Sequence, residues 1–528
     1  MRVTSIGHAG MLIETASVSI VCDPWFQPAF LGSWFVFPRN DQLSPALRQR
    51  IENADYLYIS HLHADHLDEP FLREHIKRDI AVLVPGYPTR ELERRIRALG
   101  FTNIIRTFDT EELDLGHGVT AAIHVETSIT DGPGGDSALV VSDGSTRIVD
   151  QNDCRTTDLD ALRSHGPVDL HFLQYSGAIW YPMVYDETPR DMRRLCDAKV
   201  ESQYARAINY VKAIDARYVV PSAGPPVFLD PELSHLNVIT GDELSIFPDQ
   251  RGFIERLRRQ WRGNGIFNIP GTQIDISPES MTVTHPLPQA DVDAIFDDKA
   301  AYLATYASDW SGWLDDYKQT WAQPSDDLLE RLQAWWQPLL AIAPHLRQAI
   351  GANALVRTGD LAILIDFPNG EVRRHAGEPF DFSFDIPRRL VETVANEQAV
   401  DWSNSLFLSC RFSAWRRGPF NEYLYNFFKS LSVVRMRRAE AEAIRKRFPD
   451  EEDAKDLAAE IELGGYVMQR YCPHRRADLT VFGEIEDGSL VCTLHGWRFD
   501  LGTGRCLTAD DTAIRIRPSV EQDVTPTP

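Results

Sequence analysis

The chain has 528 residues, which at roughly 150 per domain predicts about three domains with room for real cores. Its formal net charge of -23 argues against a nucleic-acid partner, because phosphate binding needs a basic face. No apolar run approaches the roughly 18 residues of a membrane span and no signal-peptide pattern opens the sequence, so we expect a cytoplasmic protein with no membrane partner.

A histidine-rich loop follows an early apolar strand. Short strands in hairpins come first, at 2–6, 10–14 and 17–21, and the apolar strand follows at 56–59. Three imidazoles and a carboxylate come directly after it, and Asp68 and Glu69 then begin a helix. Because the loop lies at the end of a strand, neighbouring side chains can converge on one ion. We predict these metal ligands: His61, His63, Asp65 and His66. The alternative is a polar loop that happens to be rich in histidine.

The elements after this loop complete a two-sheet pattern. A strand at 80–84, a charged helix at 90–99 and strands at 120–125, 138–141 and 147–149 lead to Asp153. This segment resembles the metallo-β-lactamase superfamily. The resemblance implies an αββα sandwich with one or two metals at a sheet edge, and we assign residues 1–245 to it. It also implies that Asp153 is the bridging carboxylate, and that His8 and Asp23 lie near the metal, as in the UlaG-like branch.

The ligand set departs from that of the hydrolytic family. Val220-Pro221-Ser222-Ala223 stands where the family has a late histidine, and the nearest candidate for its mid-chain histidine is His124. His124 is a metal ligand or a structural histidine. Two histidines and a carboxylate with open positions is the arrangement that non-heme Fe(II) uses to take up oxygen. We therefore predict one or two iron ions, with zinc as an alternative, and catalytic roles for Asp65, His66 and Asp153.

An α+β middle domain is predicted at 246–435. Apolar residues recur at helical spacing over 328–339, and a strand at 361–365 meets the turn pair Asn369-Gly370. Two segments have alternative interpretations. The aromatic loop 174–183 lines a substrate pocket or packs in a core. The basic segment 411–417 binds an anion or an electron-transfer partner, or is a solvated charge cluster.

The final part, 436–528, is predicted as a linker helix and a small all-β domain. Cys472-Pro473-His474 is separated by 17 residues from Cys492, and His495 follows. This resembles the Rieske pattern, in which two thiolates and two imidazoles hold a [2Fe-2S] cluster. We predict Cys472, His474, Cys492 and His495 as its ligands. A Zn(Cys2His2) site is the structural rival, but Gly496-Trp497-Arg498 continues the Rieske loop.

A metallo-β-lactamase-like part and a Rieske part on one chain resemble the CMP-N-acetylneuraminate hydroxylase family, with the domain order reversed. The resemblance implies an O2-dependent monooxygenase with a small-molecule substrate. Its electron donor would be a ferredoxin, a cytochrome or an NAD(P)H-dependent reductase. Two alternatives stay open, a metal-dependent hydrolase with a redox-sensing Rieske domain and an electron-transfer protein. The substrate is not specified, and a homo-oligomer is neither required nor excluded.

Overall fold

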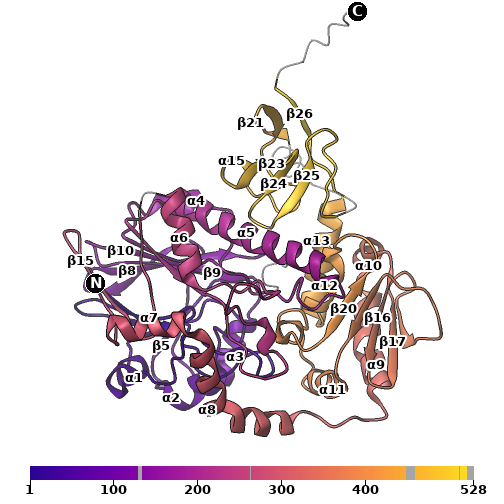
Figure 1. Cartoon of the computed structure of the whole chain (residues 1–528), viewed down its shortest axis with the longest axis horizontal. Helices are drawn as coiled ribbons and strands as arrows, with labels where there is room; N and C mark the ends of the chain where they lie inside the picture. Colours follow the sequence, from indigo (N-terminus) through magenta and orange to yellow (C-terminus); the bar gives the residue numbers. More distant parts are fainter. Residues whose placement is uncertain (129–133, 262, 448–457, 510–511, 520–528) are drawn as a thin grey trace, which may run out of the picture.

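The computed structural model describes residues 1–128, 134–261, 263–447, 458–509 and 512–519. Figure 1 shows a two-sheet sandwich on the left, a middle domain on the right and a small β domain above them. Within these ranges, no helix combines the length and the apolar character that a membrane crossing requires.

The first sheet of the sandwich contains, among the described residues, eight strands in the order β15-β14-β1-β2-β3-β4-β5-β6. Their bounds are β1 Arg2–Gly7, β2 Gly10–Glu14, β3 Ser19–Cys22, β4 Tyr56–Tyr58, β5 Ala81–Val84, β6 Ile104–Arg106, β14 Gln273–Ile276 and β15 Met281–Thr284. Helices pack their buried apolar stripes on its outer face: α1 Pro45–Glu52, α2 Glu69–His75 and α3 Glu91–Ala98. The helix predicted to begin at Asp68 and Glu69 is α2, and Asp68 caps it by accepting a hydrogen bond from the Phe71 amide.

The second sheet contains, in the same described ranges, seven strands in the order β13-β12-β11-β10-β9-β8-β7. Their bounds are β7 Glu112–Gly116, β8 Val119–Glu126, β9 Asp136–Ser142, β10 Arg147–Asn152, β11 Leu170–Gln174, β12 Tyr218–Ser222 and β13 Asn264–Gly265. The outer helices are α4 Leu159–Ser164, α5 Pro189–Ile214 and α6 Gln250–Gln260. Apolar side chains of the two sheets meet between them, so the αββα expectation is confirmed.

The sandwich extends beyond residue 245, where the sequence led us to end it. Strand β13 pairs with β12, and β14 returns to pair with β1. These pairings join residues far apart in sequence, which local patterns do not reveal.

The middle domain has a five-stranded sheet, counted over the described residues, in the order β18-β17-β16-β19-β20. Its strands are β16 Asn353–Thr358, β17 Leu361–Asp366, β18 Glu371–Arg374, β19 Phe382–Asp385 and β20 Ser413–Arg416. The helices of this part of the chain are α7 Gln289–Asp297, α8 Lys299–Thr320, α9 Leu328–Ala341, α10 Pro344–Ile350, α11 Arg388–Asn396, α12 Glu422–Lys429 and α13 Val433–Arg447. Helix α13, expected to be a linker, packs against α10 and α12 and so belongs to this domain.

The C-terminal domain consists of two small sheets. One is formed by β21 Glu460–Leu463, β22 Tyr466–Gln469 and β26 Ile516–Pro518, the other by β23 Gly483–Glu486, β24 Ser489–Cys492 and β25 Trp497–Asp500. The short helix α15, Leu479–Phe482, packs against α5 of the sandwich. The C-terminal core is therefore continuous with the outer face of the second sheet.

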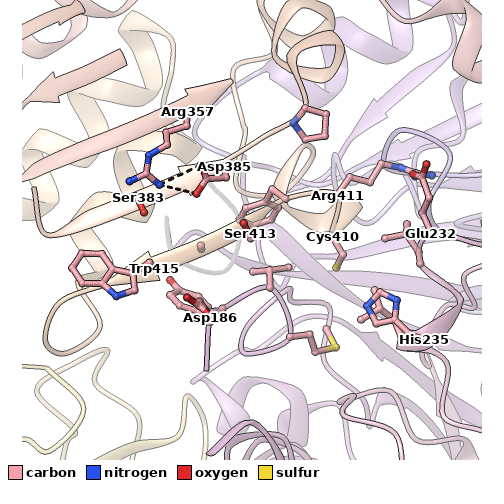
Figure 2. Close-up of a pocket in the computed structure, with 18 of the residues that line it drawn as sticks. Asp186, Glu232, His235, Arg357, Ser383, Asp385, Cys410, Arg411, Ser413 and Trp415 are labelled. Atoms are coloured by element: carbon pink, nitrogen blue, oxygen red, sulfur yellow. Dashed lines mark hydrogen bonds and ion pairs between the residues drawn. The ribbon is translucent and has the colours of Figure 1, made fainter. Parts of the chain in front are cut away.

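A cavity of about 800 Å³ lies between the sandwich and the middle domain, and Figure 2 shows residues from both parts lining it. The predicted basic segment borders it, but Arg411 is buried in ion pairs with Asp230 at 2.7 Å and Glu232 at 3.3 Å. Arg411 is therefore part of a buried ion network, whereas Arg417 at the other end of the segment is exposed. In the aromatic loop, Trp180 is buried against Phe407, which fits core packing. None of the predicted metal ligands lines this cavity.

Candidate metal and cluster sites

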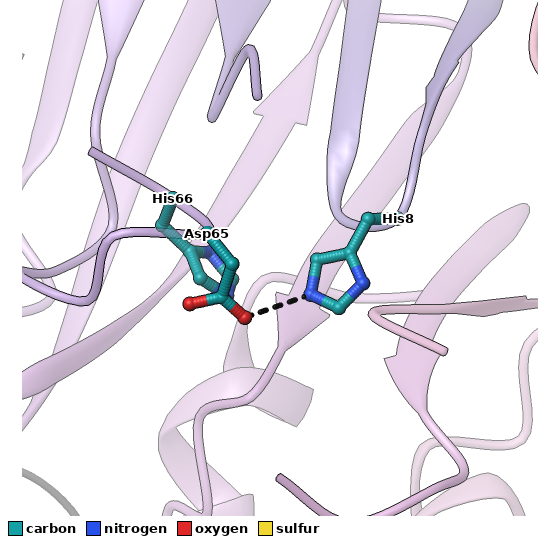
Figure 3. A group of neighbouring side chains, drawn as sticks. All are labelled: His8, Asp65 and His66. Atoms are coloured by element: carbon teal, nitrogen blue, oxygen red, sulfur yellow. Dashed lines mark hydrogen bonds and ion pairs between the residues drawn. The ribbon is translucent and has the colours of Figure 1, made fainter. Parts of the chain in front are cut away.

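Two groups of metal-ligating side chains meet at the edge of the sandwich. The first consists of His8, Asp65 and His66, whose ligand atoms all lie within 4.8 Å of one another. Figure 3 shows His8 reaching from a neighbouring hairpin toward the Asp65 carboxylate, and His8 Nε2 lies 3.1 Å from Asp65 Oδ2. This group contains two histidines and one carboxylate, a set that can hold a metal ion and leave coordination positions open for other ligands.

The second group consists of His61, His63 and Asp153, again with ligand atoms within 4.8 Å of one another. His61 Nε2 lies 2.8 Å from His63 Nδ1. Asp153 Oδ2 also lies 3.7 Å from Nε2 of His66, so this carboxylate stands between the two groups. The arrangement suits a pair of ions that share Asp153.

Contacts outside the ligand sets fix the orientation of the imidazoles. Asp23 Oδ2 lies 2.7 Å from Nδ1 of His66, and its Oδ1 accepts a hydrogen bond from the Ser60 amide at 2.8 Å. Nδ1 of His61 lies 2.9 Å from the Ser60 hydroxyl and 3.4 Å from Asp136 Oδ1. With Nδ1 engaged, Nε2 of both rings faces the site, which is how a second carboxylate orients a metal-binding histidine.

The sequence did not place His8 among the ligands. It lies in the turn between β1 and β2 with φ +52°, and its carbonyl oxygen accepts a hydrogen bond from the Ala223 amide at 3.0 Å. His8 thus lies beside the position where the hydrolytic family has its late histidine, and its imidazole joins the site from an adjacent hairpin. The only sequence signal for it was the Gly7-His8-Ala9-Gly10 match to the UlaG-like branch.

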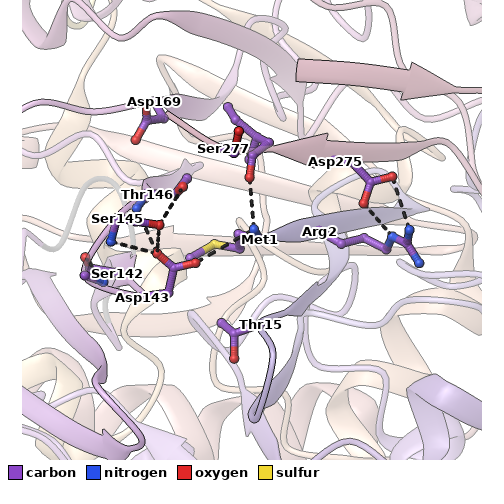
Figure 4. Close-up of polar contacts among 12 residues, drawn as sticks. Met1, Arg2, Thr15, Ser142, Asp143, Ser145, Thr146, Asp169, Asp275 and Ser277 are labelled. Carbon is purple, nitrogen blue, oxygen red and sulfur yellow. Dashed lines mark hydrogen bonds and ion pairs between the residues drawn. The ribbon is translucent and has the colours of Figure 1, made fainter. Parts of the chain in front are cut away.

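The strand that precedes His8, β1, is anchored at its beginning to both sheets of the sandwich. Figure 4 shows the amine of Met1, which donates to the Ile276 carbonyl at 2.9 Å and lies 3.8 Å from Asp143. Arg2 pairs with Asp275 on β14 at 2.8 Å. These contacts hold β1 between β14 and the turn after β9, which positions the hairpin that presents His8.

Buried atoms in both groups fit a bound metal. His66 Nε2, Asp65 Oδ1 and Asp153 Oδ1 are buried without a hydrogen-bond partner. Such atoms are costly unless an ion satisfies them. Burial and nearby imidazoles lower the pKa of His61 well below 6.5, which keeps it in the neutral form that binds metal. Burial opposes charge on His66, but Asp65 and Asp23 outweigh it and raise its pKa.

His124, a ligand candidate from the sequence, joins neither group of the described residues. Its Nε2 lies 2.8 Å from Nε2 of His165, which follows α4, and burial together with this neighbour lowers the pKa of His124 to about 4. The environment of His124 therefore fits the second interpretation from the sequence, a structural histidine. The strand was predicted correctly, but the partner comes from 41 residues away.

The four predicted cluster ligands lie together in the C-terminal domain. A hydrogen bond from Cys472 lowers the pKa of the Cys492 thiol, and the rings of His474 and His495 have centroids 4.8 Å apart. His474 Nδ1 is buried without a partner, while its Nε2 lies 2.9 Å from Glu422 Oε2 on α12. These donors fit a Rieske cluster with an imidazole oriented from outside the domain.

Helix α5 contacts the loops of both sites. Asn209 donates to the hydroxyl of Thr493, next to Cys492, at 3.0 Å. The neighbouring Tyr210 donates to the Thr156 carbonyl at 2.7 Å, three residues after Asp153. Two adjacent residues therefore connect the cluster loop with the metal loop.

Family models describe each of these parts. The Beta-lactamase superfamily domain model matches residues 19–222, the model "Rv3818-like, SCP2-like domain" matches 328–445, and the Rieske [2Fe-2S] domain model matches 457–517. The protein thus combines an N-terminal metallo-β-lactamase-fold domain with a C-terminal Rieske [2Fe-2S] domain.

The chain belongs to a family of Rieske 2Fe-2S iron-sulfur proteins. It is 42% identical over 523 residues to the Mycobacterium tuberculosis protein named "Putative Rieske 2Fe-2S iron-sulfur protein Rv3818", covering 98% of this chain and 99% of that one. It is also similar to the Cytidine monophosphate-N-acetylneuraminic acid hydroxylase of Cricetulus griseus, at 36% identity over 89 residues, which are 16% of this chain and 15% of the relative.

Solved structures were matched over about half of the chain. CmlA, a diiron beta-hydroxylase from Streptomyces venezuelae, is 16% identical with a TM-score of 0.35 and coverage of 52% of this chain and 54% of its own. Igni18, a metallo hydrolase from Ignicoccus hospitalis, is 14% identical with a TM-score of 0.35 and coverage of 54% and 98%.

Proposed function

We propose that this protein is an oxidoreductase, a Rieske-coupled non-heme iron monooxygenase that inserts oxygen into a small polar molecule. Iron would be held by His8, Asp65 and His66 and by His61, His63 and Asp153, and the [2Fe-2S] cluster by the four Rieske ligands. When bound, the iron ions would supply O2 activation and the cluster would supply electrons. An external reductase or ferredoxin would be the electron donor.

The observation that carries the proposal is the connection through α5. Asn209 and Tyr210, adjacent on α5, contact the loops that follow Cys492 and Asp153, so one helix joins the candidate cluster site to the candidate metal site. A hydrolase needs no cluster site beside its metal site. A pure electron carrier needs no second site with buried metal-ligating atoms that lack hydrogen-bond partners. The hydroxylase named among the relatives supports the same reaction class.

The protein's own residues prepare the metal site. Asp23 and Ser60 hold the rings of His66 and His61 in one orientation, so that no reorientation is needed when metal binds. Asp65, His61 and His66 are each at most 1% exposed, which excludes bulk water from these three of the six ligands. Limiting water at the ligand atoms protects oxygen chemistry from side reactions.

Reoxidation of the cluster tests the coupling without knowledge of the substrate. The Fe(II)-loaded protein is reduced anaerobically and mixed with O2, and the loss of the reduced-cluster electron paramagnetic resonance signal is timed. We expect reoxidation at least about tenfold slower in His63→Ala and in protein loaded with Zn(II), because the acceptor of the electrons is lost. Equal rates in all three samples would refute the coupling.

Oxygen-18 labelling then separates the remaining alternative once a substrate is found. Label from O2 in the product supports the monooxygenase. Label from water, in a reaction that survives His495→Ala, would instead establish the hydrolase with a redox-sensing domain.

A further inference from the structure

A basic face of α5 points toward the metal edge of the sandwich. We define the basic face as Lys199, Gln203 and Arg206, which follow one another at spacings of four and three and so share one side of the helix. Arg206 Nη2 donates to Gln174 Oε1, the last residue of β11, at 3.3 Å. Gln203 packs closely on Gly177, and a Cβ atom added to Gly177 would collide with the side-chain amide of Gln203. The basic face therefore covers the end of β11.

That strand end adjoins the metal site. Strands β10, β11 and β12 are parallel neighbours, so their carboxyl ends lie along one edge. Asp153 follows β10, and Ser176 and Gly177 follow β11. Burial and the charges of Arg155 and Arg206 lower the pKa of Lys199 to about 7, so Arg155, two residues after Asp153, acts on the same face.

Unsatisfied polar groups mark this place as a binding site. The amide oxygen and nitrogen of Gln203 and the hydroxyl of Ser176 are buried, with their side chains 1% exposed, and have no hydrogen-bond partner. Leaving buried polar groups unpaired costs stability, unless a ligand compensates them. The negative oxygen atoms of a ligand would accept hydrogen bonds from the Gln203 amide nitrogen and from the Ser176 hydroxyl.

We propose that the basic face of α5, with Ser176, binds an anionic group of the substrate, a carboxylate or a phosphate. This inference rests on the proposed function, because it takes the ligand to be the molecule that reacts at the adjacent metal groups. The anion would lie between the Asp153 loop and the cluster loop, since Ser202 of α5 lies against Gly496 beside His495. The anchored group would fix which part of the substrate faces the metal ligands.

Equilibrium dialysis of the full-length, metal-loaded protein tests the proposal. The probes are radiolabelled inorganic phosphate and radiolabelled acetate, and the probe that binds more tightly identifies the class of anion. We expect saturable binding to the wild type, weakened about tenfold or more by Lys199→Met and by Gln203→Leu, because each removes a partner of the anion. Lys212→Met, an exposed lysine on the same helix, should bind as the wild type does.

His63→Ala distinguishes the basic face from the metal ions themselves. Binding that persists in His63→Ala and is weakened in Lys199→Met supports the proposal. Binding lost in His63→Ala but kept in Lys199→Met, or no binding of either probe by the wild type, overturns it. If Lys199→Met does not fold, Gln203→Leu decides alone. Because dialysis needs no turnover, the anion site can stand even if cluster reoxidation refutes the monooxygenase.

Discussion

The metal site and the cluster site differ in where their supporting contacts originate. In the sandwich, the imidazole of His66 is held by Asp23, which belongs to the same domain. In the C-terminal domain, the imidazole of His474 is held by Glu422, which belongs to the middle domain. The metal groups are therefore complete once the sandwich has folded, whereas His474 gains its partner only when two domains dock.

The contact between Glu422 and His474 belongs to an ion network at the domain boundary. Lys446 on α13 pairs with Glu422, and burial of this carboxylate is outweighed by Lys446 and His474, which lower its pKa. Outer partners tune the electronic properties of a metal ligand. The docking of the middle domain should thus set the potential of the cluster without affecting the metal groups.

Loss of a cluster ligand should have the largest effect. In Cys492→Ala, we expect the Rieske electron paramagnetic resonance signal to disappear and the iron content to fall by the cluster's iron, while iron at the sandwich stays. Cys506→Ala is the matched control, because Cys506 is buried in the same domain and its sulfur accepts hydrogen bonds from Thr508 and Ala509. A signal that survives in Cys492→Ala would show that the ligands are assigned incorrectly.

The metal site should respond to its own internal support. Asp23→Asn removes the charge that orients His66, so we expect metal affinity at the sandwich to fall about 10- to 100-fold, with the cluster signal unchanged. Metal affinity is measured by competition with a chelator. The control is Asp55→Asn, an exposed residue whose carboxylate accepts hydrogen bonds from Ser19. Unchanged metal affinity in Asp23→Asn would mean that His66 needs no orienting carboxylate.

The cluster should respond to the middle domain. A carboxylate beside His474 stabilises the more positive, oxidised cluster, so Glu422→Gln should raise the reduction potential, by about 50–100 mV if one charge-assisted hydrogen bond is weakened. Redox titration monitored by the cluster signal measures it. Glu442→Gln removes a carboxylate 3.6 Å from Lys446 that does not hydrogen-bond His474, and should shift the potential less. Equal shifts of the reduction potential in the two variants would mean that the loss of a negative charge near the cluster causes the effect, and not the loss of the hydrogen bond to His474.

The same contrast explains what the sequence could reveal. His61, His63, Asp65 and His66 lie in one loop, and the cluster ligands lie in two short loops, so spacing alone predicted them. Support from distant residues was invisible: His8 and Asp65 are 57 positions apart, and Glu422 and His474 are 52 apart. Strand periodicity located most elements of the sandwich, but nothing local shows that β14 will pair with β1.

The smallest expected effect concerns stability at the basic face between the two sites. Burial, with the charges of Arg155 and Arg206, lowers the pKa of Lys199 from 10.5 to about 7. Between pH 7 and 10.5 the unfolded chain keeps a proton on Lys199 that the folded chain has lost, so the free energy of unfolding rises with pH across this window. Below pH 7 the folded protein bears the cost of the charge on the partly buried Lys199.

Removing that charge should therefore stabilise the protein in a pH-dependent way. We expect Lys199→Met to raise the free energy of unfolding by about 1–3 kcal/mol at pH 6, and the gain to shrink as the pH approaches 10.5. Thermal unfolding at pH 6, 8 and 10 measures it, with the exposed Lys212→Met as control. A gain of equal size at all three pH values would reflect better packing of methionine. A gain in the free energy of unfolding that is confined to low pH would show that the charged form of Lys199 destabilises the folded protein. That result is expected if Lys199 is there to bind a ligand.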